Sequence, residues 1–173
     1  MKKLLTILLV AVTMLTASAQ TNTLTLAPDA TSGKSEAGSY ELTLGGGGTS
    51  VDGENEVGLD FSISTNPFKQ APNLWLGLSQ GVAWEPKLSG STDVNANWSW
   101  HLFKALYLNT GWSAGVVYSR GDGEFDSYWR TGPEATFQYY VGDNAFVYSG
   151  VNYDVITRGE SGFRYSFGIG LSF

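Results

Sequence analysis

Few residues in this chain have side chains suited to acid–base or nucleophilic chemistry. The sequence contains one histidine, His101, and no cysteine. Covalent catalysis needs a nucleophile, a base and an orienting acid within hydrogen-bond reach of one another. Ser99 precedes His101 by two residues, which places both side chains on one face of an extended strand. That face is otherwise polar, and the pair lies near a strand end, so we expect no catalytic residues and no enzymatic activity.

Two other stretches have features of ligand-binding loops. Gly45 to Glu54 begins with four successive glycines, but neither a Gly-Lys-Ser/Thr sequence nor a helix follows, as a phosphate-binding loop requires. We predict a mobile loop there. Asp122, Glu124 and Asp126 present alternate carboxylates, yet the pattern does not continue to the bidentate glutamate of a calcium-binding loop. We predict a solvated loop over residues 120–128, no metal site and no cofactor.

Most other polar residues alternate with apolar ones. Phe163 to Phe173, which reads FRYSFGIGLSF, shows this pattern most clearly. Arg164 and small residues alternate with large apolar residues. These are Phe163, Tyr165, Phe167, Ile169, Leu171 and Phe173. Period-two alternation predicts a strand with two different faces.

Seven earlier segments repeat this alternation. We predict eight strands, over about 39–46, 56–65, 73–84, 93–102, 105–119, 129–141, 144–155 and 163–173. Links one, three, five and seven are expected to be longer and rich in Gly, Asp and Glu, whereas links four and six have only a couple of residues. Short turns that alternate with longer loops are typical of an up-and-down antiparallel barrel in a membrane.

The larger face of these strands carries Trp, Tyr, Phe, Leu and Val with almost no charge. Facing water, it would form a very large exposed apolar surface, whereas in lipid it needs no partner. After the N-terminus no apolar run is long enough for a membrane helix, and a membrane protein without such a helix must be a closed barrel. The sequence therefore predicts an all-β, transmembrane, up-and-down antiparallel barrel of eight strands.

The N-terminus has the features of an export signal. Met1-Lys2-Lys3 is basic, Leu4 to Leu15 is mostly apolar, and Ala17-Ser18-Ala19 is an A-x-A cleavage site. The apolar run is shorter than the roughly 18 residues of a spanning helix, which argues against a retained anchor. We predict a signal peptide over 1–19 with cleavage after Ala19, a flexible periplasmic lead-in over 20–38, and the barrel over 39–173.

Composition argues against a nucleic-acid-binding protein and against structures held by cysteine. The chain has 16 acidic and 10 basic residues and a net charge of −6, which argues against nucleic-acid binding. Without cysteine there is neither a disulfide framework nor a thiolate metal site.

The polar face would line the barrel interior, which in eight-stranded barrels is about wide enough to be filled by side chains. Buried charges need partners, so we expect a polar network there. Its predicted members are Asp60, Arg130, Glu134, Asp154 and Arg164. Asp154 and Arg164 lie on neighbouring strands at similar height and should approach closely. Trp75 and Tyr107 are the only clear large aromatic residues assigned to this face.

The export signal, the eight alternating segments, the link lengths and the aromatic end at Phe173 together resemble the small outer-membrane barrels of the OmpA/OmpX-like superfamily. The resemblance implies the outer membrane of a Gram-negative bacterium, with membrane lipid around a barrel that has no further soluble domain. It also implies that the barrel assembly machinery reads the terminal strand, through Phe163, Tyr165, Phe167, Ile169, Leu171 and Phe173. The His and Ser of lipid A deacylases, two apart on the lipid-facing side near the outer surface, are absent.

Three functions remain open at this point. The first is a non-enzymatic structural or surface-interaction role through extracellular loops, whose partner the sequence does not identify. The second is a narrow porin-like channel for water, ions or small solutes. The third is a soluble periplasmic lipid binder of lipocalin type, in which inward aromatic side chains would line an apolar pocket.

The terminal strand leads to a first prediction. Deletion of Phe173 should lower the amount of barrel in the outer membrane, because it removes the aromatic end of the proposed assembly signal. Quantification of folded protein in membrane fractions checks this. Wild-type levels of the deletion variant would contradict the proposed role of Phe173.

Overall fold

A computed structural model describes residues 38–51, 54–85, 88–121, 124–157 and 159–173. The predicted signal peptide, its cleavage site and all of the lead-in before Gly38 lie outside the described residues. None of the described residues forms a helix long and apolar enough to cross a membrane.

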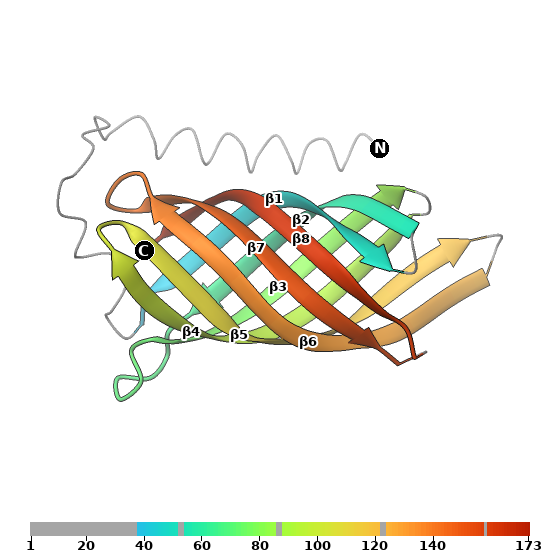
Figure 1. Cartoon of the computed structure of the whole chain (residues 1–173), viewed down its shortest axis with the longest axis horizontal. Coiled ribbons are helices and arrows are strands. Elements are labelled where there is room, and N and C mark those ends of the chain that lie inside the picture. Colours follow the sequence, from blue (N-terminus) through green and yellow to red (C-terminus); the bar gives the residue numbers. More distant parts are fainter. Residues whose placement is uncertain (1–37, 52–53, 86–87, 122–123, 158) are drawn as a thin grey trace.

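Eight antiparallel strands close into one barrel in sequence order (Figure 1). They are β1 (Tyr40–Val51), β2 (Glu54–Thr65), β3 (Leu74–Glu85), β4 (Ser89–Phe103), β5 (Leu106–Gly121), β6 (Glu124–Tyr140), β7 (Ala145–Ile156) and β8 (Ser161–Ser172). β1 pairs with β8 from Glu41↔Ser172 to Val51↔Gly162. Phe173 N–H donates to Tyr40 O at 2.8 Å, and Tyr40 N–H donates to Phe173 O at 3.1 Å. The predicted eight-stranded barrel is confirmed.

Alternation along the strands separates two faces. The outward residues are exposed and mostly large and apolar, as in Val57, Leu59, Phe61 and Ile63 of β2. Along β2, β3, β7 and β8 the outward residues with described side chains are all uncharged. The inward residues are smaller or polar, and many of them are buried. Because lipid offers no hydrogen-bond partners, this division fits a barrel whose outer face meets hydrocarbon.

The prediction of a mobile loop over Gly45–Glu54 is wrong. β1 continues through the four glycines to Val51 and pairs with β2 on one side and β8 on the other. On the outer face, the rings of Tyr165 and Phe167 lie over Gly48 and Gly46. Aromatic residues that cover strand glycines supply the packing that glycine itself lacks. Two strand neighbours therefore hold extended a segment whose composition favours a loop.

The other predicted loop boundaries also need correction. β4 begins at Ser89 rather than near Asp93, β5 and β6 extend into the predicted 120–128 loop, and β8 begins at Ser161. The longest link covers residues 66–73, between β2 and β3. Only two residues separate β5 from β6, where a longer link was predicted. The expected alternation of link lengths is therefore wrong, because strand pairing continues beyond the roughly 9–11 residues needed to cross a membrane.

The end that carries both termini of the barrel also carries the β2–β3, β4–β5 and β6–β7 links (Figure 1). Because the lead-in before β1 is predicted to be periplasmic, we call this end the periplasmic end. At the opposite end the β5–β6 hairpin extends furthest. β7 pairs with β6 only as far as Arg130, and β4 pairs with β5 only as far as Ser119. The tip of this hairpin therefore stands beyond the barrel wall.

A pair of glycine variants tests the close packing of β1. A Cβ at Gly47 would meet the Tyr165 carbonyl oxygen and lie 3.1 Å from Ser166 Cα, whereas at Gly46 the nearest atom is 3.6 Å away. Gly47→Ala should lower the free energy of unfolding by about 1–3 kcal/mol, because backbone atoms cannot move aside easily. Gly46→Ala should be neutral or raise it by up to about 1 kcal/mol.

Urea unfolding of both variants in lipid vesicles measures the difference. Equal stability of Gly47→Ala and Gly46→Ala would show that β1 does not approach β8 as closely as described.

Candidate functional site in the barrel lumen

The lumen holds a four-residue ion cluster. Arg130 donates from Nε to Asp93 Oδ1 at 2.8 Å and from Nη2 to Asp93 Oδ2 at 2.6 Å. Arg164 bridges two carboxylates, with Nη1 3.2 Å from Asp93 Oδ2 and Nε 3.2 Å from Asp154 Oδ2. Asp154 is fully buried, and Asp93 and Arg130 are nearly so. A bidentate guanidinium–carboxylate pair is the strong form of such a contact.

Glycines on intervening strands allow these charges to meet. In the ladder, Asp93 of β4 and Arg130 of β6 both pair with Gly115 of β5. A Cβ at Gly115 would touch the Asp93 carboxylate. The missing side chain therefore lets Asp93 reach across β5 to Arg130. From the sequence alone, Gly115 is only one of several small residues expected on the inner face.

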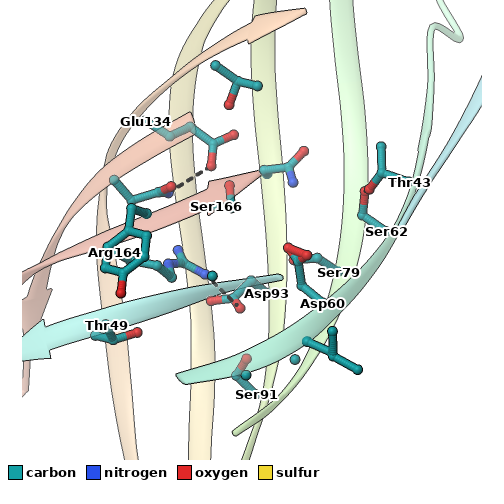
Figure 2. A pocket seen from close by; sticks show the side chains of 18 of the residues that line it. Thr43, Thr49, Asp60, Ser62, Ser79, Ser91, Asp93, Glu134, Arg164 and Ser166 are labelled. Atoms are coloured by element: carbon teal, nitrogen blue, oxygen red, sulfur yellow. Dashed lines mark hydrogen bonds and ion pairs between the residues drawn. The ribbon is translucent and has the colours of Figure 1, made fainter. Parts of the chain in front are cut away.

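Glu134 also reaches a partner across a strand glycine. Asn97 of β4 and Glu134 of β6 lie on either side of Gly111 and are joined by a hydrogen bond from Asn97 Nδ2. Glu134 also accepts from Asn152 Nδ2 at 2.9 Å. Figure 2 shows Glu134 and Arg164 directed into the same pocket.

Asp60 meets its partner across two strands. One row of the ladder runs from Asp60 through Gly45 and Gly168 to Tyr148. Tyr148 Oη donates to Asp60 Oδ1 at 3.1 Å. This contact crosses the two strands, β1 and β8, that close the barrel.

Aromatic side chains close the periplasmic end of the lumen. Tyr107, Tyr140 and Phe146 form a buried cluster, with ring centroids 5.5 Å apart for Tyr107 and Tyr140 and 5.2 Å apart for Tyr140 and Phe146. Tyr140 Oη donates to Glu41 Oε1 at 2.9 Å, and Gln138 Nε2 donates to Glu41 Oε2 at 3.2 Å. We call Tyr107, Tyr140 and Phe146 the aromatic floor.

A polar cavity of about 200 Å³ lies above this floor (Figure 2). It extends from Glu41 and Trp75 near the periplasmic end to Thr49 and Glu56 near the other end. One side is lined by small residues of β1, β2, β3 and β8. These include Thr43, Gly47, Thr49, Gly58, Ser62, Ser79, Gly81 and Ser166. The lining contains five carboxylates and two guanidinium groups, so its formal charge is negative.

The structure brings part of the predicted polar network together. Arg164 contacts Asp154, and Arg164 and Arg130 meet at Asp93, which is not a member of the predicted network. Glu134 and Asp60 are bound instead by asparagine and tyrosine side chains. Sequence spacing cannot identify Asp93 as the centre, because its partners lie 37 and 71 residues away.

The sequence also missed inward aromatic residues. Tyr140, Phe146 and Tyr148 face the lumen together with Trp75 and Tyr107. Continued alternation through the last residue of β6 and the first residues of β7 would have found them. Tyr107, Tyr140 and Phe146 form the buried cluster below the cavity, whereas Trp75 and Tyr148 line the cavity together with polar residues.

The residues first considered for chemistry are placed as follows. His101 lies at the periplasmic rim, where its Nε2 is 2.7 Å from Lys104 O and its ring stacks on Tyr107 at 4.9 Å. Asp122 lies outside the described residues, and Glu124 and Asp126 belong to β6 rather than to a loop. Among the described residues, no group of three or more His, Cys, Asp or Glu could hold a metal ion.

The predicted assembly-signal residues lie on the outer face of the closing strand. Phe163, Tyr165, Phe167 and Ile169 are exposed, Leu171 is half-buried, and Phe173 is exposed just beyond the strand. They form part of an apolar belt around the barrel. Two belt tryptophans satisfy their indole N–H on neighbouring strands, since Trp100 donates to Thr110 Oγ1 at 3.0 Å and Trp112 donates to Thr131 Oγ1 at 2.7 Å.

No protein-family model matches the chain, and no curated protein sequence matches it. Solved structures do match. Neisserial surface protein A has a TM-score of 0.58 and 15% identity over 79% of this chain and 98% of that chain. Ail, the attachment invasion locus protein of Yersinia pestis, has a TM-score of 0.55 and 15% identity over 80% of this chain and 100% of that chain. A transmembrane barrel of de novo design has a TM-score of 0.53 and 16% identity over 81% and 99%.

The chain has the fold of the small eight-stranded outer-membrane β-barrels. Its apolar belt and charged interior fit a barrel that spans a membrane. The likeness to a designed barrel shows that this fold by itself specifies no activity.

Removal of the central carboxylate tests the ion cluster. Asp93→Ala should lower the free energy of unfolding in lipid vesicles by about 3–5 kcal/mol, because it leaves the buried Arg130 guanidinium without its bidentate partner and Arg164 with one carboxylate instead of two. Asp143→Ala, in an exposed turn, is the control and should change stability by less than about 0.5 kcal/mol.

The double variant Asp93→Leu with Arg130→Met should recover part of the loss, because it removes both partners of the bidentate pair. If Asp93→Ala and Asp143→Ala unfold at the same urea concentration, the ion cluster does not stabilise the barrel.

Proposed function

We propose that this protein is a non-enzymatic outer-membrane barrel that acts as a rigid scaffold for a surface-interaction element, the β5–β6 hairpin. The proposal is supported by one combination of features. Ion pairs join side chains of four strands inside the lumen, and the β5–β6 hairpin projects beyond the barrel wall. We propose that this hairpin is extracellular, because it lies opposite the end that carries the termini.

The lumen supports the scaffold role. Side chains from β4, β6, β7 and β8 are joined through Asp93, Arg130, Asp154 and Arg164, and the aromatic floor closes the end below them. Ion pairs between side chains of four strands hold those strands together. A barrel stiffened in this way can hold its hairpins in fixed positions, as recognition surfaces on scaffolds require.

The hairpin supports the interaction role. Residues 124–128 of β6 pair with β5, whereas the ladder between β6 and β7 ends at Arg130. Phe125 is 74% exposed near the tip, and Trp129 is 63% exposed at its base. Exposed aromatic residues are enriched where proteins bind one another. We therefore expect Phe125, near the tip of the hairpin, to contact the partner.

Cell adhesion tests this proposal. Bacteria that display the wild-type protein should attach to a cultured cell layer more than bacteria without it, and Phe125→Ser should reduce this attachment at least threefold. Glu160→Ser, at the exposed β7–β8 link, is the matched control and should bind as the wild type does. Equal binding by Phe125→Ser and the wild type, at equal surface levels, would contradict the role of the hairpin.

The polar cavity favours a second candidate function, a narrow channel. It reaches from the outer end of the lumen down to the aromatic floor. As described, the floor closes this path.

A further inference from the structure

We propose that the lumen is a closed cation path, in which the cavity forms an acid-lined vestibule and the aromatic floor is its gate. The proposal goes beyond the scaffold role, because it concerns the interior of the barrel rather than its hairpin. It rests on the position of the cavity, on the residues that line it and on the side chains that close it.

The cavity lies beside the ion cluster rather than being filled by it. Arg130 and Arg164 are held against Asp93 and Asp154, on the β4, β6, β7 and β8 side of the lumen. The opposite wall is lined by glycine, serine and threonine, which leave space along β1, β2 and β3. Figure 2 shows Thr43, Ser62 and Ser79 on this side, across the pocket from Arg164. The ion cluster therefore fills only part of the cross-section of the lumen.

The charge along this space favours cations. Both arginines are bound to Asp93, so their charge is largely compensated within the cluster. Two further lining carboxylates accept hydrogen bonds from neutral groups, Asp60 from Tyr148 Oη and Glu134 from Asn152 Nδ2. A cleft lined by one sign of charge, with low-dielectric walls, raises the local concentration of counter-ions.

The floor is the barrier. Tyr107 comes from β5, Tyr140 from β6 and Phe146 from β7, and all three are buried. Glu41 and Gln138 lie on the cavity side of Tyr140 and are joined to each other. Phe146 fills the space opposite Gly170, where even a Cβ would meet its ring. Apolar constrictions stop ion flow by excluding water, and the vestibule above supplies ions only when such a constriction opens.

Planar-bilayer recording tests the gate. The double variant Tyr140→Ala with Phe146→Ala should show discrete openings, whereas the wild type should be silent. The matched control is Tyr139→Ala with Val147→Ala, which removes lipid-facing side chains from the same strands at the same level, and it should also be silent. In a tenfold KCl gradient, the reversal potential of the open variant should lie toward that of potassium.

Three results would overturn the proposal. They are openings in the wild type, a silent Tyr140→Ala/Phe146→Ala variant whose electrophoretic mobility shows that it is folded, and a reversal potential toward that of chloride. The adhesion assay does not depend on the lumen. A negative bilayer result therefore leaves the proposed hairpin role unaffected, and a negative adhesion result leaves the proposed gate unaffected.

A second measurement leaves the floor unchanged, in case the double variant does not fold. The chain has no cysteine, so Ser79→Cys places a single thiol in the cavity, next to Asp60 in Figure 2. A cationic methanethiosulfonate (the trimethylammonium-ethyl reagent) should modify it about tenfold faster than the anionic sulfonatoethyl reagent, after correction for their rates with a free thiol. Ser149→Cys, on the lipid-facing side of β7, should stay unmodified.

An unreactive thiol in folded Ser79→Cys protein would show that the vestibule does not admit ions. Equal rates with the two reagents, or a faster anionic reagent, would show that the lining does not favour cations. Either result overturns the proposal.

Discussion

Closure of the hydrogen-bond ladder between β1 and β8 is the constraint on which the rest of this structure depends. In lipid, an unpaired strand edge leaves backbone groups without any partner, so the first and last strands must meet. The reciprocal hydrogen bonds between Tyr40 and Phe173, and the row from Asp60 through Gly45 and Gly168 to Tyr148, both cross this junction. Closure turns one face of every strand toward lipid and the other toward an enclosed lumen.

Enclosure then decides how the inward charges behave. A buried arginine needs a carboxylate. Arg130 and Asp93 lie on β6 and β4, and Gly115 on the strand between them leaves room for the contact, as Gly111 does for Asn97 and Glu134. Glycine thus has two uses in this barrel. On the inner face it lets polar side chains reach across a strand, and on the outer face of β1 it lets Tyr165 and Phe167 pack over the backbone.

The fold was largely predictable from the sequence, and the site only in part. Alternation in segments such as Phe163–Phe173 is visible without a structure, because strand periodicity is local. The strand ends were harder to predict. Gly45–Gly48 and Phe125–Tyr128 have loop-like compositions, but pairing with adjacent strands holds them extended. Asp93 could be assigned to the inner face, but not to the centre of the cluster, since that depends on the stagger between strands.

The sequence alone therefore determined the class of architecture, the division into two faces and the list of inward charges, since each follows from residue type and a period of two. Only the tertiary structure decided which charges meet, where the aromatic floor closes the lumen and how far the β5–β6 hairpin projects. These features depend on register around a closed barrel, which brings Arg164 to Asp93 across 71 residues of sequence. No local pattern encodes that register, because it is set by all eight strands together.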